Sequence, residues 1–253
     1  MLRITDTVKH LIIINFILWL GTLLLKSQGI DLNEILALYY PENENFKFWQ
    51  VVTHMFMHDS SGPMHIIFNM LALWMFGTPL EQMWGRNKFL FFYFSTGLGA
   101  FLLHTLANFY QFNSGLEALT QAGVNQDTIM RLLNDGQYDS NWIHLIGEKK
   151  ALGMAGAYGI PAVGASGAIF GILVAFGMLF PNAELMLIFL PIPVKAKYFI
   201  PIIIALELFS GLTGVSIFSP SNTAYFAHIG GALTGFLIMW FWKRSQFNSN
   251  RWD

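Results

Sequence analysis

Long apolar runs separated by short polar segments dominate the chain. A helix that spans a bilayer needs about 20 mainly apolar residues. Six windows approach that length, and we expect spanning helices at residues 8–25, 64–83, 88–110, 164–181, 197–216 and 224–242. No small-residue cleavage site follows the first window, so we expect an anchor there and not a signal peptide. The pattern predicts an all-α membrane protein with six transmembrane helices.

The polar segments between these windows differ in character. Residues 26–63 mix acids with aromatic residues, which favours a partly buried outer loop that lies against the membrane. Residues 111–160 are mostly polar and form an outer insertion, in which NQDTIMRLL (125–133) is typical of a short helix. The segment PIPVKAKYFIP (191–201) is basic and contains three prolines, so it predicts a short inner turn.

Composition agrees with a membrane location. Hydrophobic residues make up 54% of the chain and charged residues 11%, with a mean hydropathy of +0.48. We find no linker or internal repeat and expect a single polytopic domain over residues 1–253. The net charge of −1 gives no reason to expect a nucleic-acid partner, and the lack of cysteine excludes thiolate metal sites and disulfides.

Basic residues indicate the orientation, because they favour the cytoplasmic side of a membrane. Nine of the 14 fall on one side of the six windows: Arg3, Lys9, Arg86, Lys88, Lys195, Lys197, Lys243, Arg244 and Arg251. We therefore expect both termini in the cytoplasm. The bias, together with the lack of an organelle address, favours a prokaryotic inner membrane.

This orientation brings polar side chains of three helices to one depth. Ser166, His228 and the pair His65 and Asn69 all lie near the outer starts of their helices. Polar groups at membrane depth are costly, and they are functional candidates when they face a bundle interior. A neutral histidine activates a serine hydroxyl as a nucleophile. Ser166 and His228 are thus a candidate catalytic pair.

Small residues predict that the fourth and sixth helices approach closely. Each helix has two glycines four positions apart, a spacing that lets backbones pack in lipid: Gly167, Gly171, Gly231 and Gly235. We expect this contact to bring Ser166 and His228 together. The ring of Phe170, one turn after Ser166, is placed to pack against the imidazole of His228.

Acyl transfer also needs hydrogen-bond donors for the oxyanion. The His65 imidazole, the Asn69 amide and the backbone N–H of Ser166 are suitable. No acid stands beside His228 in the sequence, so we predict a dyad, and a third group from another part of the chain stays open.

Other polar residues have simpler interpretations. His54 and His58 have the H-x-x-x-H spacing of a zinc pair, but the usual glutamate is absent, so we expect no metal site and favour hydrogen bonding within the loop. Glu207 lies deep in the fifth window, where it could relay protons in a transporter. For Glu81 we expect a role in capping or fixing a neighbouring loop.

Three classes of function fit these residues. The first is a serine endopeptidase. The second is a transporter or channel, with a pathway lined by His65, Asn69, Glu207 and His228. The third is a non-catalytic scaffold that binds membrane proteins.

Three motifs together resemble the rhomboid intramembrane serine proteases. They are H-x-x-x-N at His65 to Asn69, the run Gly164-Ala165-Ser166-Gly167, and the run Ala227-His228-Ile229-Gly230-Gly231. The resemblance covers residues 45–110 and 160–242. It implies that Ser166 is the nucleophile and His228 the base, and that His65, Asn69 and the Ser166 amide hold the oxyanion. It also implies that single-pass membrane proteins are cut near the outer face without a cofactor.

The resemblance adds a role for Glu81, which is similar to a family acid that braces the first outer loop. Three features depart from the family pattern. Phe170 stands where many members have tyrosine, and FKFW (46–49) replaces the usual Trp-Arg pair of the first outer loop. The insertion at 111–160 is also longer than the family core needs.

Overall fold

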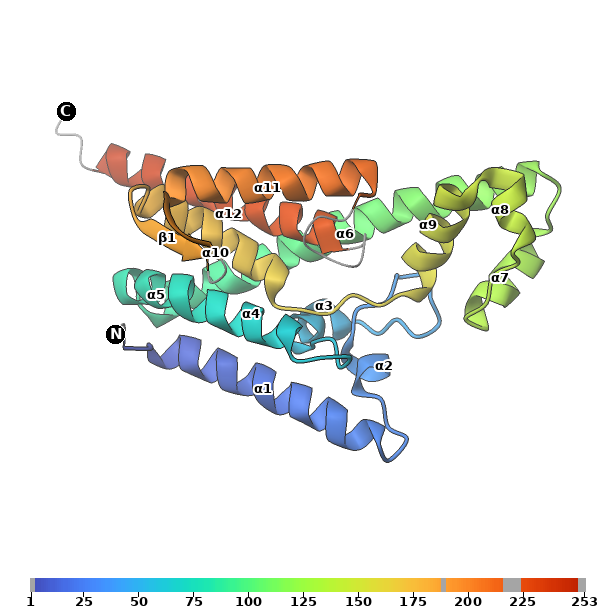
Figure 1. The fold of residues 1–253 in the computed structure, drawn as a ribbon, viewed down its shortest axis with the longest axis horizontal. Coiled ribbons are helices and arrows are strands. Elements are labelled where there is room, and N and C mark those ends of the chain that lie inside the picture. The colour runs from blue at the N-terminus through green and yellow to red at the C-terminus, as the bar shows by residue number, and fades with distance from the viewer. Residues whose placement is uncertain (1–2, 188–189, 216–223, 250–253) are drawn as a thin grey trace.

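The protein is mostly helical in the computed structural model, which describes residues 3–187, 190–215 and 224–249 (Figure 1). The longer helices are α1 (Asp6–Lys26), α6 (Arg86–Gln121), α9 (Glu148–Gly159), α10 (Ser166–Leu179), α11 (Ala196–Thr213) and α12 (Ala224–Ser249). The shorter ones are α2 (Leu32–Leu36), α3 (Gln50–Thr53), η1 (His54–Phe56), α7 (Gln126–Asn134) and α8 (Asn141–Ile146). Residue 216 of the expected fifth helix and Arg251 lie outside the described residues.

Within the described part of the chain, four helices are long and apolar enough to cross a membrane: α1, α6, α11 and α12. A further apolar run is continuous but mixed in geometry. It consists of α4 (Met64–Ala72), the π-helical segment η2 (Leu73–Gly77) and α5 (Thr78–Trp84). The last apolar helix, α10, has only 14 residues, or about 21 Å, which is shorter than the roughly 30 Å hydrocarbon core.

Helix α10 lies at the centre of the bundle. It packs against α6, α11, α12 and η2, and nine of its 14 residues are buried. Its apolar side chains belong to one core that joins α1, α4, η2, α5, α6 and α11, with Phe76 and Phe176 in edge-to-face contact. A residue at the start of α10 is therefore surrounded by other helices.

The structure corrects the expected extent of the third apolar helix. We expected residues 88–110, whereas α6 runs from Arg86 to Gln121 and includes eleven residues of the predicted insertion. Beyond the lipid a helix does not need apolar residues on every side. The extension buries Phe112, Gly115 and Leu119 along one face, and the window method missed it because its other faces are polar.

The rest of the insertion forms a folded cap on the C-terminal part of α6. Helices α7, α8 and α9 build a second core with residues of α6 and the first outer loop, around Tyr40, Phe112, Trp142 and Tyr158. The amide Nδ2 of Asn43 in this loop donates to the Tyr158 carbonyl over 2.9 Å. The cap lies at the opposite end of the molecule from the N-terminus (Figure 1).

The segment between α10 and α11 also differs from the prediction. Instead of a short turn, strands β1 (Glu184–Leu187) and β2 (Leu190–Lys195) form an antiparallel hairpin, with Glu184 opposite Lys195. The prolines of β2 misled the sequence interpretation. They are tolerated because both strands of a two-stranded sheet are edge strands, where a missing N–H need not break a ladder.

Candidate active site

Ser166 is the first residue of α10, after a segment that is held in place by the outer loop. The Gly164 amide donates to the His54 carbonyl over 3.0 Å, and Leu38 forms an isolated bridge with Ala162. Gly164 has φ +128°, a conformation that favours glycine, and a Cβ there would lie 3.2 Å from the His65 ring. This glycine therefore sets the approach to the serine and leaves room for the imidazole.

The structure brings Ser166 and His228 together. The Oγ of Ser166 lies 2.9 Å from Nε2 of His228, which comes from the second turn of α12. The serine is half-buried and the histidine is buried. This is the distance that a general base needs to take the hydroxyl proton.

The second ring nitrogen of His228 contacts an acid that our serine-protease interpretation did not include. Nδ1 of His228 lies 2.8 Å from Oε2 of Glu207 on α11. A carboxylate accepts hydrogen bonds, so this contact favours the tautomer with hydrogen on Nδ1 and leaves the Nε2 lone pair facing Ser166. The missed signal was depth, because Glu207 lies in the C-terminal half of α11, which brings it to the level of His228 near the start of α12.

The ring of Phe170 stacks on the imidazole of His228. The ring centroids are 4.2 Å apart and the planes differ by 9°. Phe170 thus lies where the spacing from Ser166 predicts it, and the contact restricts rotation of the imidazole.

The glycines bring three helices into close contact. A Cβ on Gly231 would lie 1.8 Å from the Gly167 carbonyl oxygen, and one on Gly235 would lie 2.8 Å from Gly171. The glycines of α10 face α6 instead, since a Cβ on Gly167 would lie 2.5 Å from the Ala100 Cβ of that helix. The glycines of α12 thus face the backbone of α10, and Gly167 faces α6.

His65 and Asn69 lie on α4, and His65 is near the serine. A Cβ added to Gly164 would lie 3.2 Å from Nε2 of His65 and 3.4 Å from Oγ of Ser166. Both polar groups therefore border the same small space. Nδ2 of Asn69 donates to the His65 carbonyl over 2.8 Å. An amide NH₂ has two hydrogens, which leaves one for another acceptor.

The two histidines of the first outer loop differ in their surroundings. Nδ1 of His54 lies 2.7 Å from the Gln50 carbonyl, as expected for hydrogen bonding within the loop. His58 is fully buried, and its ring centroid is 5.1 Å from that of His65. Among the described residues, no group of three or more His, Asp or Glu side chains is arranged to hold a metal ion.

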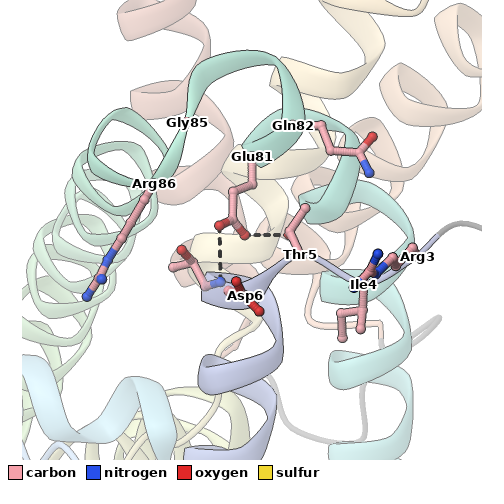
Figure 2. Close-up of a pocket in the computed structure, with 9 residues that line it drawn as sticks. Arg3, Ile4, Thr5, Asp6, Glu81, Gln82, Gly85 and Arg86 are labelled. Atoms are coloured by element: carbon pink, nitrogen blue, oxygen red, sulfur yellow. Dashed lines mark hydrogen bonds between the residues drawn. The ribbon is translucent and has the colours of Figure 1, made fainter.

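The family resemblance implied that Glu81 braces the first outer loop. In the structure its hydrogen bonds go to the start of α1 instead. Figure 2 shows its side chain pointing from α5 towards the start of α1. Its carboxylate accepts hydrogen bonds from the amides of Thr7 and Val8, both over 3.0 Å, and from the Thr5 hydroxyl. The acid caps α1 because α5 ends on the side of the bundle where α1 begins, far from that loop.

Comparison with known proteins shows which family the chain belongs to. A family model described as the Rhomboid domain matches residues 45–245. The chain belongs to the rhomboid family. The match includes Ser166, His228 and Glu207, and it makes the chain an integral membrane protein with several spans.

Several curated rhomboid proteins are similar to parts of the chain. Rhomboid protein 1, mitochondrial, of Saccharomyces cerevisiae is 27% identical over 177 residues, which cover 70% of this chain and 37% of that protein. Rhomboid protease GluP of Bacillus subtilis is 32% identical over 80 residues, 30% of this chain and 15% of its own length. Rhomboid-like protease 3 of Toxoplasma gondii is 34% identical over 70 residues, 28% of this chain and 26% of its own length. The rhomboid match thus spans well under half of each relative.

Proposed function

We propose that the protein is an intramembrane serine endopeptidase that cleaves single-pass transmembrane proteins near the extracytoplasmic face. The observation that supports this most directly is the 2.9 Å contact between Ser166 Oγ and His228 Nε2 inside a helical bundle. The names of the relatives add support, since GluP and the Toxoplasma protein are called proteases.

The reaction uses a Ser-His pair and an acyl-enzyme. Oγ of Ser166 attacks the carbonyl carbon of the scissile bond while its proton passes to Nε2 of His228. The tetrahedral intermediate collapses, the C–N bond breaks, and the imidazolium gives its proton to the leaving amine. Water then attacks the ester, loses a proton to Nε2 and releases the new carboxyl end, and the proton returns to Oγ.

The negative oxygen of each tetrahedral intermediate needs donors. We assign this role to the His65 ring, the Asn69 amide and the Ser166 N–H. The closeness of His65 Nε2 and Ser166 Oγ around Gly164 supports the first, and the position of Ser166 in the first turn of α10 supports the third, because the first amides of a helix have no partner within it.

We further propose one polytopic domain with six spans, formed by α1, the α4–α5 run, α6, α10, α11 and α12, in a prokaryotic inner membrane. Both termini are then cytoplasmic. The start of α1 and the β1–β2 hairpin, which contains Lys195, lie at the end of the bundle away from the cap (Figure 1). Basic residues favour the cytoplasmic side.

The substrates in this proposal are transmembrane proteins, and no cofactor takes part. A regular helix shields its carbonyl groups within its own hydrogen bonds, so a substrate helix has to unwind before Oγ can attack. We therefore expect cleavage next to small or helix-breaking residues.

The test uses the purified chain in detergent with a labelled transmembrane substrate. Wild type, Ser166→Ala and His228→Ala are compared side by side, and the products are identified by mass. We expect cleavage by wild type alone. Equal cleavage by all three would exclude the mechanism, and cellular function that survives Ser166→Ala would favour a scaffold.

A further inference from the structure

Glu207 is a buried acid in a span, and its position follows from the packing of α11. The helix turns one stripe of residues inwards: Ala196, Ile200, Glu207 and Ser210. Only 4% of the Glu207 side chain is exposed. Acids inside membrane proteins are costly and mark functional sites when they have a defined partner.

The partner of Glu207 is the histidine of the candidate active site. Oε2 lies 2.8 Å from Nδ1 of His228, and the other ring nitrogen lies 2.9 Å from Ser166 Oγ. The three side chains come from α11, α12 and α10, and two hydrogen-bond contacts connect the carboxylate to the imidazole and the imidazole to the hydroxyl. Stacking of Phe170 on the same ring holds its plane.

We propose that Glu207 is a positioning residue that makes the site a Ser-His-Glu triad and not a dyad. This inference rests on the proposed function, because it concerns how the same base works. The carboxylate accepts the hydrogen on Nδ1 and so keeps the Nε2 lone pair towards Ser166. When Nε2 takes the serine proton, the negative charge of Glu207 stabilises the imidazolium, while the Nδ1 hydrogen stays on the ring.

The charge state of the acid decides whether the site works. A protonated carboxyl would donate to Nδ1 and leave the ring hydrogen on Nε2, facing the hydroxyl. Nε2 would then have no lone pair for the serine proton. The geometry favours catalysis only with the ionised acid, and replacement by an amide removes the charge while it keeps the size of the side chain.

The test compares Glu207→Gln and Glu207→Asp with wild type and Ser166→Ala in the cleavage assay. We expect Glu207→Gln to lower kcat by about 10²–10⁴-fold with little change in KM, as for the acid of other serine hydrolases. Glu207→Asp keeps the charge and should be clearly faster than Glu207→Gln. Ser210→Ala removes another buried polar group on the same face of α11 and serves as the control, with activity close to wild type.

The outcomes separate this inference from the proposed function. If Ser166→Ala is inactive and Glu207→Gln has a kcat within threefold of wild type, the triad is wrong and the protease stands. If Ser166→Ala cleaves like wild type, the proposed function itself fails. If the variants fold poorly, the inference can still be tested on the wild-type protein. ¹⁵N NMR of the His228 ring should then show hydrogen on Nδ1, and hydrogen on Nε2 would overturn the assignment.

Discussion

At the scale of single residues, the imidazole of His228 is fixed from three directions. Ser166 and Glu207 hold its two nitrogens, and Phe170 covers its face. Each contact restricts a different movement, since hydrogen bonds set the direction of the nitrogens and stacking sets the tilt of the plane. The ring should therefore need little reorganisation before proton transfer.

The stacking contact can be tested on its own. We expect Phe170→Ala to lower kcat by about 2- to 10-fold, because an aromatic pair contributes about 0.5–1.5 kcal/mol and a tenfold change in rate corresponds to about 1.4 kcal/mol. Phe170→Tyr keeps the ring and should retain most of the activity. The assay is steady-state cleavage of the labelled substrate. Equal kcat for wild type and Phe170→Ala would show that the ring does not position the base.

Glu81 illustrates a residue whose effect is on stability and not on chemistry. We expect Glu81→Gln to weaken the attachment of α1 by about 1–3 kcal/mol, because its charge-assisted hydrogen bonds to the first turn of α1 are lost or weakened. The measurement is the midpoint of thermal unfolding in detergent. Glu184→Gln changes an exposed acid in β1 and should leave the midpoint unchanged. The idea fails if both variants unfold like wild type.

At the scale of elements, the site depends on the close packing of α6, α10 and α12. Gly231→Ala would place a methyl group 1.8 Å from the Gly167 carbonyl oxygen, which is backbone and has no room to move aside. We expect α12 to shift away from α10, with loss of cleavage and a lower unfolding midpoint. Gly21→Ala in α1 meets its nearest neighbour at 3.6 Å and is the matched control, expected to be active and equally stable. Full activity of Gly231→Ala would mean that the helices can separate without harm.

The sequence predicts some of these elements and contacts better than others. Depth and glycine spacing led us to place Ser166 beside His228. Spanning helices fix the depth of each residue, and glycines four positions apart mark close contacts between helices. Glu207 was missed because its position along the fifth helix was not compared with that of His228, and the acid was assigned to a transporter pathway instead. The extension of α6 and the hairpin at 184–195 were not predicted. Hydropathy windows identify long apolar segments, and they say little about polar segments that pack against the rest of the protein.

At the scale of the whole molecule, α6 connects two hydrophobic cores. Its 36 residues correspond to about 54 Å, well beyond the roughly 30 Å of hydrocarbon. Its N-terminal part packs in the bundle core, and its C-terminal part packs with Phe112 and Leu119 in the core of the cap (Figure 1). The cap also binds the first outer loop through Asn43 and Glu44. The loop that supports the start of α10 is therefore itself attached to the cap.

The same loop gives the whole molecule a dependence on pH. Burial lowers the pKa of His54 to about 4, and burial together with the charge of His65 lowers the pKa of His58 to about 3. Both rings stay neutral in the folded protein at mildly acidic pH, whereas an unfolded chain protonates them near pH 6.5. The unfolded state thus binds more protons below about pH 6.5, and the free energy of unfolding falls as the pH is lowered from there towards 4.

We expect each of these histidines to reduce the free energy of unfolding by on the order of 2 kcal/mol between pH 7 and pH 5. The measurement is the midpoint of thermal unfolding in detergent at pH 8, 7, 6 and 5. Wild type should change little between pH 8 and 7 and fall more steeply below pH 6.5. His58→Phe removes one titrating ring and keeps an aromatic side chain, so its midpoint should fall less between pH 7 and pH 5, whatever its absolute value. Parallel curves for His58→Phe and wild type would contradict the assignment, because the acid sensitivity would then come from groups other than His58.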